Sequence, residues 1–168
     1  ATSVIPFAAF PLSGVISHTE AASSLGSHVI MLLMAAFMLS KALEKANLHK
    51  RFAIYMLRVT GSGSPLKVIL GFMMTTAVLS MWISNTATIL MMLPMAIAII
   101  NALDNPRFGV ALILGIAYAA SLGGVGTPIG TPPNIIFMSV YEETQGVEYS
   151  FIEWMKTGIP IVIVAIPV

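Results

Sequence analysis

Long apolar runs dominate the chain, and polar residues interrupt them at a few places. The longest run carries no charged residue from 68 to 102, and its middle holds the polar patch Ser84-Asn85-Thr86. A helix crosses a bilayer in roughly 20 residues at about 1.5 Å per residue. The run 65–101 is nearly twice that long, so we predict two antiparallel helical arms, 65–83 and 86–101, that meet at this polar tip.

The remaining apolar segments predict further helices on either side of this hairpin. In chain order, we expect the tail of a membrane segment at 1–16, a polar loop at 17–27, a spanning helix at 28–43, a broken helix at 107–141, an acidic loop at 142–153 and the start of a further helix at 153–168.

Residues 48–60 show a different pattern, with apolar side chains at helical spacing opposite the basic residues Lys50, Arg51 and Arg58. Such a helix suits the membrane interface, where the apolar face is buried and the basic face stays in water. Gly61-Ser62-Gly63-Ser64-Pro65 ends this helix and starts the next one. We therefore predict an amphipathic interfacial connector at 48–64.

Composition supports a helical membrane protein. Hydrophobic residues make up 57% of the chain and charged residues only 9%, whereas soluble domains carry about 25% charged residues. The net charge of +1 and the lack of a basic patch argue against a nucleic-acid partner. Because cysteine is absent, disulfide and thiol chemistry are excluded. The apolar segments also contain no paired carboxylates, histidine cluster or activated nucleophile, so we expect neither an enzyme nor an organic cofactor.

The basic residues predict the orientation in the membrane. Six of the eight Lys and Arg lie between Lys41 and Lys67, while the segments 17–27 and 142–153 contain none. The positive-inside rule then places 44–64 and 103–107 in the cytoplasm and the other two loops outside. This orientation leaves open whether the hairpin arms cross the membrane fully or re-enter it partway, because both arms return to the cytoplasm in either case.

The hairpin tip has two interpretations. It is either an ordinary outer-surface turn between two spanning helices or a polar site inside the membrane. The second is favoured because the tip has no charge, Gly or Pro, and because Ser80 lies one turn before Ser84 on the same helix face. Free carbonyl groups at the end of the first arm suit a small cation. Free N–H groups at the start of the second arm suit an anion.

A second interruption, at 123–134, contains four glycines and three prolines within twelve residues. Thr131 followed by Pro132 indicates an N-cap with proline at the first helical position, and so a second positive helix end. The alternatives are a surface loop or a packing kink at which glycines let helices approach closely. The polar sequence inside an apolar segment favours a binding site.

Together the two interruptions resemble the divalent anion/sodium symporter family, which carries dicarboxylates, tricarboxylates or sulfate. Their order and separation also match, and the similarity extends from about residue 28 to residue 141. The residues that carry it are Ser80-Met81-Trp82-Ile83-Ser84-Asn85-Thr86-Ala87-Thr88 and Ser121-Leu122-Gly123-Gly124-Val125-Gly126-Thr127-Pro128-Ile129-Gly130-Thr131-Pro132-Pro133-Asn134.

The resemblance implies a re-entrant hairpin that opens to the cytoplasm, and it assigns roles to particular residues. One sodium ion would be held by Ser80, Ser84, Asn85 and Gly130. The anion would touch Ser84, Asn85 and Thr86, with the helix start at Thr131 and Pro132 close by.

The family has two inverted repeats, each with its own Ser-Asn-Thr tip, and this chain contains one such tip. We therefore expect an all-α integral membrane protein that forms the first repeat of an inverted-repeat transporter. The second repeat, with its own sodium site, would be missing from this chain. The parts would be scaffold helices at 1–47, the connector at 48–64 and a transport-domain part at 65–168, which includes the re-entrant hairpin 65–101.

The predicted function is secondary active transport of a dicarboxylate-type anion such as succinate, malate or fumarate, coupled to sodium and driven by an elevator motion. Citrate and sulfate are further possible substrates. We expect a multi-pass protein of the cell inner (cytoplasmic) membrane that contacts lipid and forms a homodimer in its full-length form. The alternatives are a sodium-independent exchanger of the same family, and a channel or structural membrane subunit.

Overall fold

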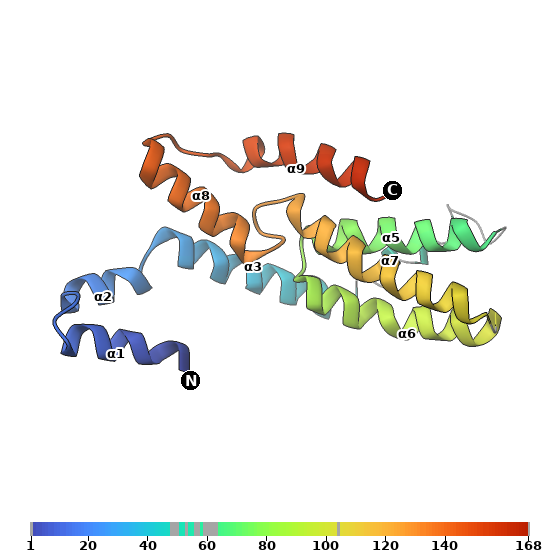
Figure 1. The fold of residues 1–168 in the computed structure, drawn as a ribbon, viewed down its shortest axis with the longest axis horizontal. Helices are drawn as coiled ribbons and strands as arrows, with labels where there is room; N and C mark the ends of the chain where they lie inside the picture. The colour runs from blue at the N-terminus through green and yellow to red at the C-terminus, as the bar shows by residue number, and fades with distance from the viewer. Residues whose placement is uncertain are drawn as a thin grey trace.

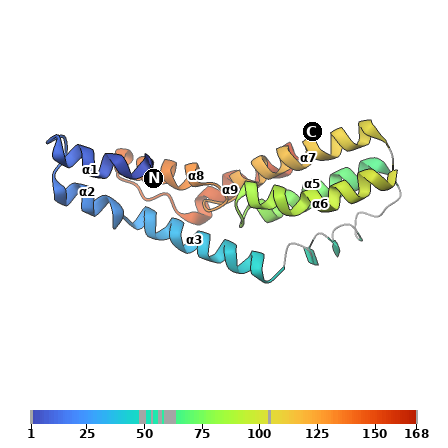
Figure 2. The ribbon, with the colours of Figure 1, turned by 90° about the horizontal axis from the view of Figure 1, so that it is seen from below.

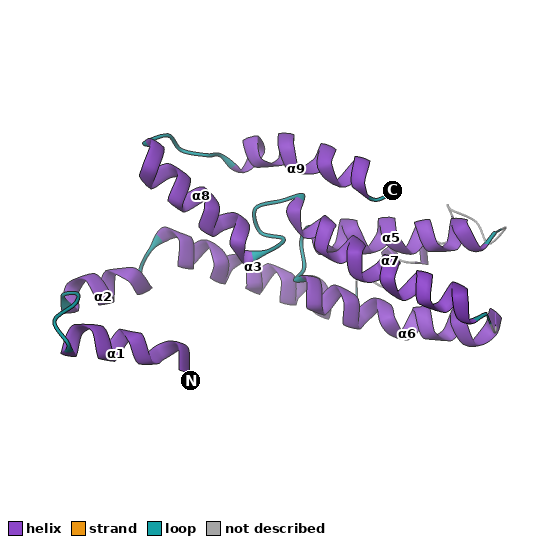
Figure 3. Ribbon diagram, in the orientation of Figure 1, coloured by secondary structure: helices purple, strands orange, loops and turns teal. Residues whose placement is uncertain are grey.

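The computed structural model describes residues 2–47, 51–52, 54–55, 58, 64–103 and 105–167. This part of the chain is helical and contains no strand (Figures 1 and 3). The elements are a 3-10 turn at Thr2–Val4, α1 at Ile5–Leu12, α2 at His18–Leu25, α3 at His28–Lys45, α5 at Pro65–Ser80, α6 at Asn85–Leu103, α7 at Pro106–Val125, α8 at Pro132–Gln145 and α9 at Phe151–Ala165.

Helices α5, α6 and α7 form a bundle that carries the main core (Figures 1 and 2). α5 and α6 are the antiparallel arms of the predicted hairpin, and α7 runs alongside both. Phe72, Met92, Leu112 and Ile116, at most 2% exposed, fill the space between the three helices. This packing fixes the hairpin tip beside the end of α7, where α7 is interrupted.

The arms of the hairpin differ slightly from the predicted bounds. α5 ends at Ser80 and not at residue 83, where the backbone N–H of Trp82 bonds to the carbonyl oxygen of Leu79 three residues before it and so tightens the last turn. Ser84 then caps α6, which begins at Asn85. The turn at the hairpin tip therefore spans residues 81–84, and Asn85 and Thr86 of the polar patch lie in the first turn of α6.

The second interruption is narrower than predicted. α7 continues through Gly123 and Gly124 to Val125, so only residues 126–131 are non-helical before α8 begins at Pro132, as expected. The two glycines serve close packing. A Cβ atom on Gly123 would lie 2.4 Å from the carbonyl oxygen of Ala77, which shows that α7 contacts the backbone of α5 directly.

Two predicted loops are partly helical. The polar loop at 17–27 contains α2, because Ser17 and Glu20 form a capping box that satisfies the free N–H groups of its first turn. α8 extends into the predicted acidic loop as far as Gln145, and Gly146, with a φ of +66°, follows as its C-cap. Most of the connector at 48–64 lies outside the described residues.

Two of the described helices, α6 and α7, are long and apolar enough to cross a membrane. α5 is apolar but shorter. α3 forms where a spanning helix was expected, but it is not one of these two, and its C-terminal end carries Lys41, Glu44 and Lys45. The division into scaffold, connector and transport domain stays a prediction.

Candidate functional site

The site lies where the hairpin tip meets the end of α7, and its centre is the contact between Ser80 and Asn85. The Ser80 hydroxyl lies 2.6 Å from Oδ1 of Asn85 and 2.7 Å from the carbonyl oxygen of Ala120. One hydroxyl proton cannot fully satisfy both acceptors at once. Three oxygen atoms, one each from α5, α6 and α7, thus lie together at a buried point with a single proton among them. Such a cluster of acceptors suits a cation.

Two glycines let further oxygen atoms approach this point. A Cβ atom on Gly124 would lie 2.6 Å from Oδ1 of Asn85. A Cβ atom on Gly130 would lie 2.5 Å from the carbonyl oxygen of Gly124 and 3.0 Å from that of Ser80. Carbonyl groups at unwound or terminal helix positions are the sodium ligands of many transporters. The residues at this point thus fit a sodium ion.

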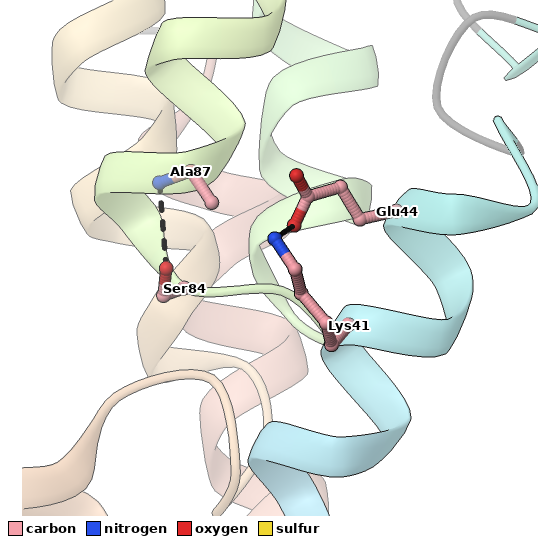
Figure 4. A network of polar contacts seen from close by, with 4 residues as sticks. All are labelled: Lys41, Glu44, Ser84 and Ala87. Atoms are coloured by element: carbon pink, nitrogen blue, oxygen red, sulfur yellow. Dashed lines mark hydrogen bonds and ion pairs between the residues drawn. The ribbon is translucent and has the colours of Figure 1, made fainter.

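Of the four predicted sodium residues, the structure brings three together: Ser80, Asn85 and Gly130. The fourth, Ser84, directly precedes α6, and its Oγ accepts a hydrogen bond from the backbone N–H of Ala87 at 3.3 Å (Figure 4). Its oxygen therefore acts first as the cap of α6. The sodium role of all four residues stays a prediction.

The start of α6 offers donors to an anion. Among the described residues, the backbone N–H groups of Asn85 and Thr86 have no hydrogen-bond partner, as is usual for the first turn of a helix. The side chains of Ser84 and Thr86 are exposed, so an anion can reach these groups from outside the bundle. Free N–H groups and the positive helix end favour negative charge at this position.

The start of α8 is less rich in donors. Thr131 occupies the N-cap position in an extended conformation, but its side chain makes no capping hydrogen bond. Pro132 and Pro133 have no N–H group at all, and the N–H of Asn134 is already bonded to the carbonyl oxygen of Thr131. This helix end therefore contributes its dipole and the half-buried Thr131, with few backbone donors.

Three side chains without a separate predicted role hold the break after α7 in place. The Asn134 side-chain amide donates to the carbonyl oxygens of Gly124 and Thr127, at 2.8 and 2.9 Å. Trp154 of α9 donates its ring N–H to the carbonyl oxygen of Val125 at 2.8 Å. The hydroxyl of Thr127 donates to the carbonyl oxygen of Met81 and so ties the break to the hairpin tip.

Of these three residues, only Asn134 could have been singled out from the sequence, because a polar residue directly after two prolines lies inside the first turn of the new helix. Nothing in the sequence near Trp154 points to this role, because its partner Val125 lies 29 residues away along the chain.

The tip also faces the C-terminal half of α3. Leu39 and Leu43 of α3 and Trp82 and Ile83 of the tip line an apolar cavity of about 650 Å³. Lys41 of α3 forms an exposed ion pair with Glu44 at 2.8 Å (Figure 4). Within the described part of the chain, no group of three or more His, Cys, Asp or Glu residues could hold a metal ion.

Comparison with known proteins identifies the family of the chain. A protein family described as citrate transporter matches the chain over residues 1–168. The chain is also 39% identical, over 175 aligned residues, to the sodium-dependent dicarboxylate transporter SdcS of Staphylococcus aureus strain USA300, and equally to that of strain NCTC 8325. Each alignment covers 98% of this chain and 34% of the relative, so the chain spans about a third of the length of these relatives.

The matched proteins are named as transporters and not as enzymes. The family match covers the whole chain, and it includes both polar interruptions. The chain therefore belongs to the citrate transporter family, which confirms its resemblance to the divalent anion/sodium symporters.

Proposed function

We propose that this chain provides the first half of the sodium and anion sites of a sodium-coupled dicarboxylate transporter. The observation that carries the proposal is the double role of Asn85. Its side-chain oxygen belongs to the buried oxygen cluster with Ser80, while its backbone N–H is one of the free donors at the start of α6. A cation and an anion bound at this residue would lie on either side of the same short turn, and each would stabilise the other.

The charges of the chain explain why the anion would need sodium. Between residues 68 and 141 the only charged residues are Asp104 and Arg107. Arg107 lies in the first turn of α7, at the other end of that helix from the hairpin tip. The starts of α6 and α8 contribute about half a positive charge each, less after screening. A dicarboxylate therefore requires charge from bound cations or from the second repeat.

In the complete protein, a second repeat of inverted orientation would supply the other tip and the other sodium site. The transport-domain part would then move against the scaffold helices in an elevator motion. α3 contacts α8, and Leu43 of α3 packs on the hairpin core, so these contacts are where the two parts would slide. The full-length protein would act as a homodimer in the cytoplasmic membrane.

Uptake by the full-length parent in liposomes tests the proposal. Labelled succinate, citrate and sulfate are offered with an inward gradient of sodium, and with choline in its place. We expect concentrative uptake of a dicarboxylate only with sodium. Counterflow that does not depend on sodium would identify the exchanger. Uptake that never exceeds the external concentration would identify a channel.

Calorimetry tests the charge argument directly. We expect the anion to bind the full-length parent at least about tenfold more tightly in sodium than in choline, which corresponds to about 1.4 kcal/mol. Linkage requires that the anion tighten sodium binding by the same factor. Equal affinities in the two salts would reject sodium coupling.

Labelling tests whether the hairpin re-enters the membrane. Cysteines introduced at Met81 and Ala87 of the full-length parent should react slowly with a bulky impermeant reagent added from outside, because the tip would then lie within the membrane. A cysteine at Val147, in the loop predicted to lie outside, serves as the fast control. Fast labelling of the tip from outside in every transport state would show that the arms span the membrane.

A further inference from the structure

Two threonines of the hairpin have buried hydroxyl groups without a partner. Thr76 on α5 and Thr88 on α6 are both 0% exposed, and neither Oγ1 has a hydrogen-bond partner within the described part of the chain. The neighbouring Thr75, equally buried, donates to the carbonyl oxygen of Gly71 at 2.7 Å, as helical threonines commonly do. A buried hydroxyl without a partner costs about 1–3 kcal/mol, so two of them need an explanation.

Their positions relate them to the sodium site. Thr76 lies one helical turn before Ser80, and Thr88 lies one turn after Asn85, so each shares a helix face with its site residue. Ser80 and Asn85 touch across the two arms. The two hydroxyl groups therefore lie about 5.4 Å further from the tip, in the next layer of the same hairpin.

Apolar side chains close the hairpin beyond this layer. Phe72 is one further turn along α5 and Met92 one further turn along α6, and both belong to the main core. A polar molecule in the threonine layer would thus be shielded from solvent on the core side. A buried water is retained where it finds two to four polar partners, and Thr76, Thr88 and Ser80 provide three.

We propose that Thr76 and Thr88 bind one water molecule that links the arms of the hairpin and holds the Ser80 and Asn85 oxygens in position for sodium. The threonines are positioning residues, because they act through Ser80 and Asn85 and do not touch the ion. The water bridge fixes the separation of the arms one turn below the site. This inference rests on the proposed sodium coupling.

The test measures sodium dependence and stability together in the full-length parent. In Thr76→Val/Thr88→Val, the sodium concentration for half-maximal dicarboxylate uptake should rise about tenfold, as when residues that orient metal ligands are lost. Each single valine variant should give a smaller rise in the same direction. The melting temperature should change little, because valine has the shape of threonine and the water leaves together with both hydroxyls, so that no polar group of the two side chains stays buried without a partner.

Two matched variants separate this role from a purely structural one. Thr76→Ser/Thr88→Ser keeps both hydroxyls and should retain the parent's sodium dependence. Thr75→Val removes a buried hydroxyl that is bonded only within its own helix, so it should leave sodium dependence unchanged. If the single and double valine variants keep the parent's half-saturation, the inference is overturned.

Asn85→Ala distinguishes this failure from failure of the proposed function. If sodium stimulates the parent, and Asn85→Ala abolishes the stimulation while the valine variants keep it, then only the threonine layer is rejected. If sodium does not stimulate the parent at all, both proposals are rejected.

Discussion

The hairpin tip at 81–84 and the break at 126–131 interrupt apolar helices side by side, but they leave their backbone groups in different states. At the break, successive carbonyl oxygens at the end of α7 all have donors: Gly126 for Gly123, Asn134 for Gly124 and Trp154 for Val125. At the start of α6, the N–H groups of Asn85 and Thr86 stay free within the described contacts. The break is thus closed by the protein itself, whereas the tip keeps donors available.

This difference assigns separate tasks to the two interruptions. Non-helical backbone in a membrane must be satisfied by protein or line a polar cavity. The break meets this requirement with side chains from α8 and α9, so it can form a rigid side of the binding site. The tip meets the requirement only in part, and ligands would complete it. Variants of the side chains that bond to the break should therefore reduce stability, and variants of the tip should reduce transport.

The largest loss of stability is expected for Asn134→Ala. This change leaves the carbonyl oxygen of Gly124 without its side-chain donor and weakens the bonding of Thr127, at a cost on the order of 2–4 kcal/mol. Thermal unfolding of the purified full-length parent measures the effect. Thr144→Ala is the control, since Thr144 is an exposed residue on the same helix that bonds only within its own turns. A variant as stable as the parent would show that the break is not braced by Asn134.

The same substitution at the tip should give the opposite result. Asn85→Ala removes the amide oxygen from the cluster with Ser80, so sodium-dependent uptake should fall more than about tenfold, as expected when a metal ligand is lost. Stability should fall by no more than about 1 kcal/mol, because Asn85 is only partly buried. The Ser80 hydroxyl also keeps an acceptor in the variant, since it can donate to the carbonyl oxygen of Ala120. Normal sodium-dependent uptake would show that Asn85 is not a sodium ligand.

A smaller loss of stability than in Asn134→Ala is expected for Trp154→Phe, which removes one hydrogen bond to Val125 and keeps an aromatic ring. The ring packs edge-on against Phe137 and Tyr149, with centroids 5.9 and 6.2 Å away, and phenylalanine retains most of this contact. Stability should therefore fall by about 1 kcal/mol. Trp82→Phe is the control, because Trp82 lies in the tip and is 39% exposed. Equal effects of the two changes would reject the bracing role of Trp154.

The sequence predicted those features that depend on local composition. The uncharged run with a polar centre predicted the hairpin, and Thr131-Pro132 predicted the start of α8. The predicted end of α7 is three residues too early because glycine usually breaks helices, although Gly123 and Gly124 are helical where α7 packs on α5 and Asn85. It also missed α2, because the capping box at Ser17 outweighs the polarity of that segment.

The bracing of the break depends on contacts between distant segments, which local patterns do not reveal. Trp154 reaches Val125, and Thr127 reaches Met81, across 29 and 46 residues of sequence. The buried hydroxyls of Thr76 and Thr88, which have no partner among the described residues, are equally hidden in the sequence, because Thr75 next to Thr76 is the same residue type and has a satisfied bond. The place of the site could therefore be predicted, but the parts that hold it could not.

The smallest change in stability is expected for Thr131→Ala. Loss of an N-cap typically costs about 1 kcal/mol, but the Thr131 side chain makes no capping hydrogen bond, so we expect less than about 0.5 kcal/mol. Ser84→Ala removes an existing cap of α6 and should cost more, by the ordinary amount. Thermal unfolding of both variants in the full-length parent gives this order. If Thr131→Ala also lowers anion affinity in sodium, then its hydroxyl acts on the anion and not on the helix, because folding would be unaffected. A large loss of stability would instead return Thr131 to a structural role and leave the tip as the source of the anion's donors.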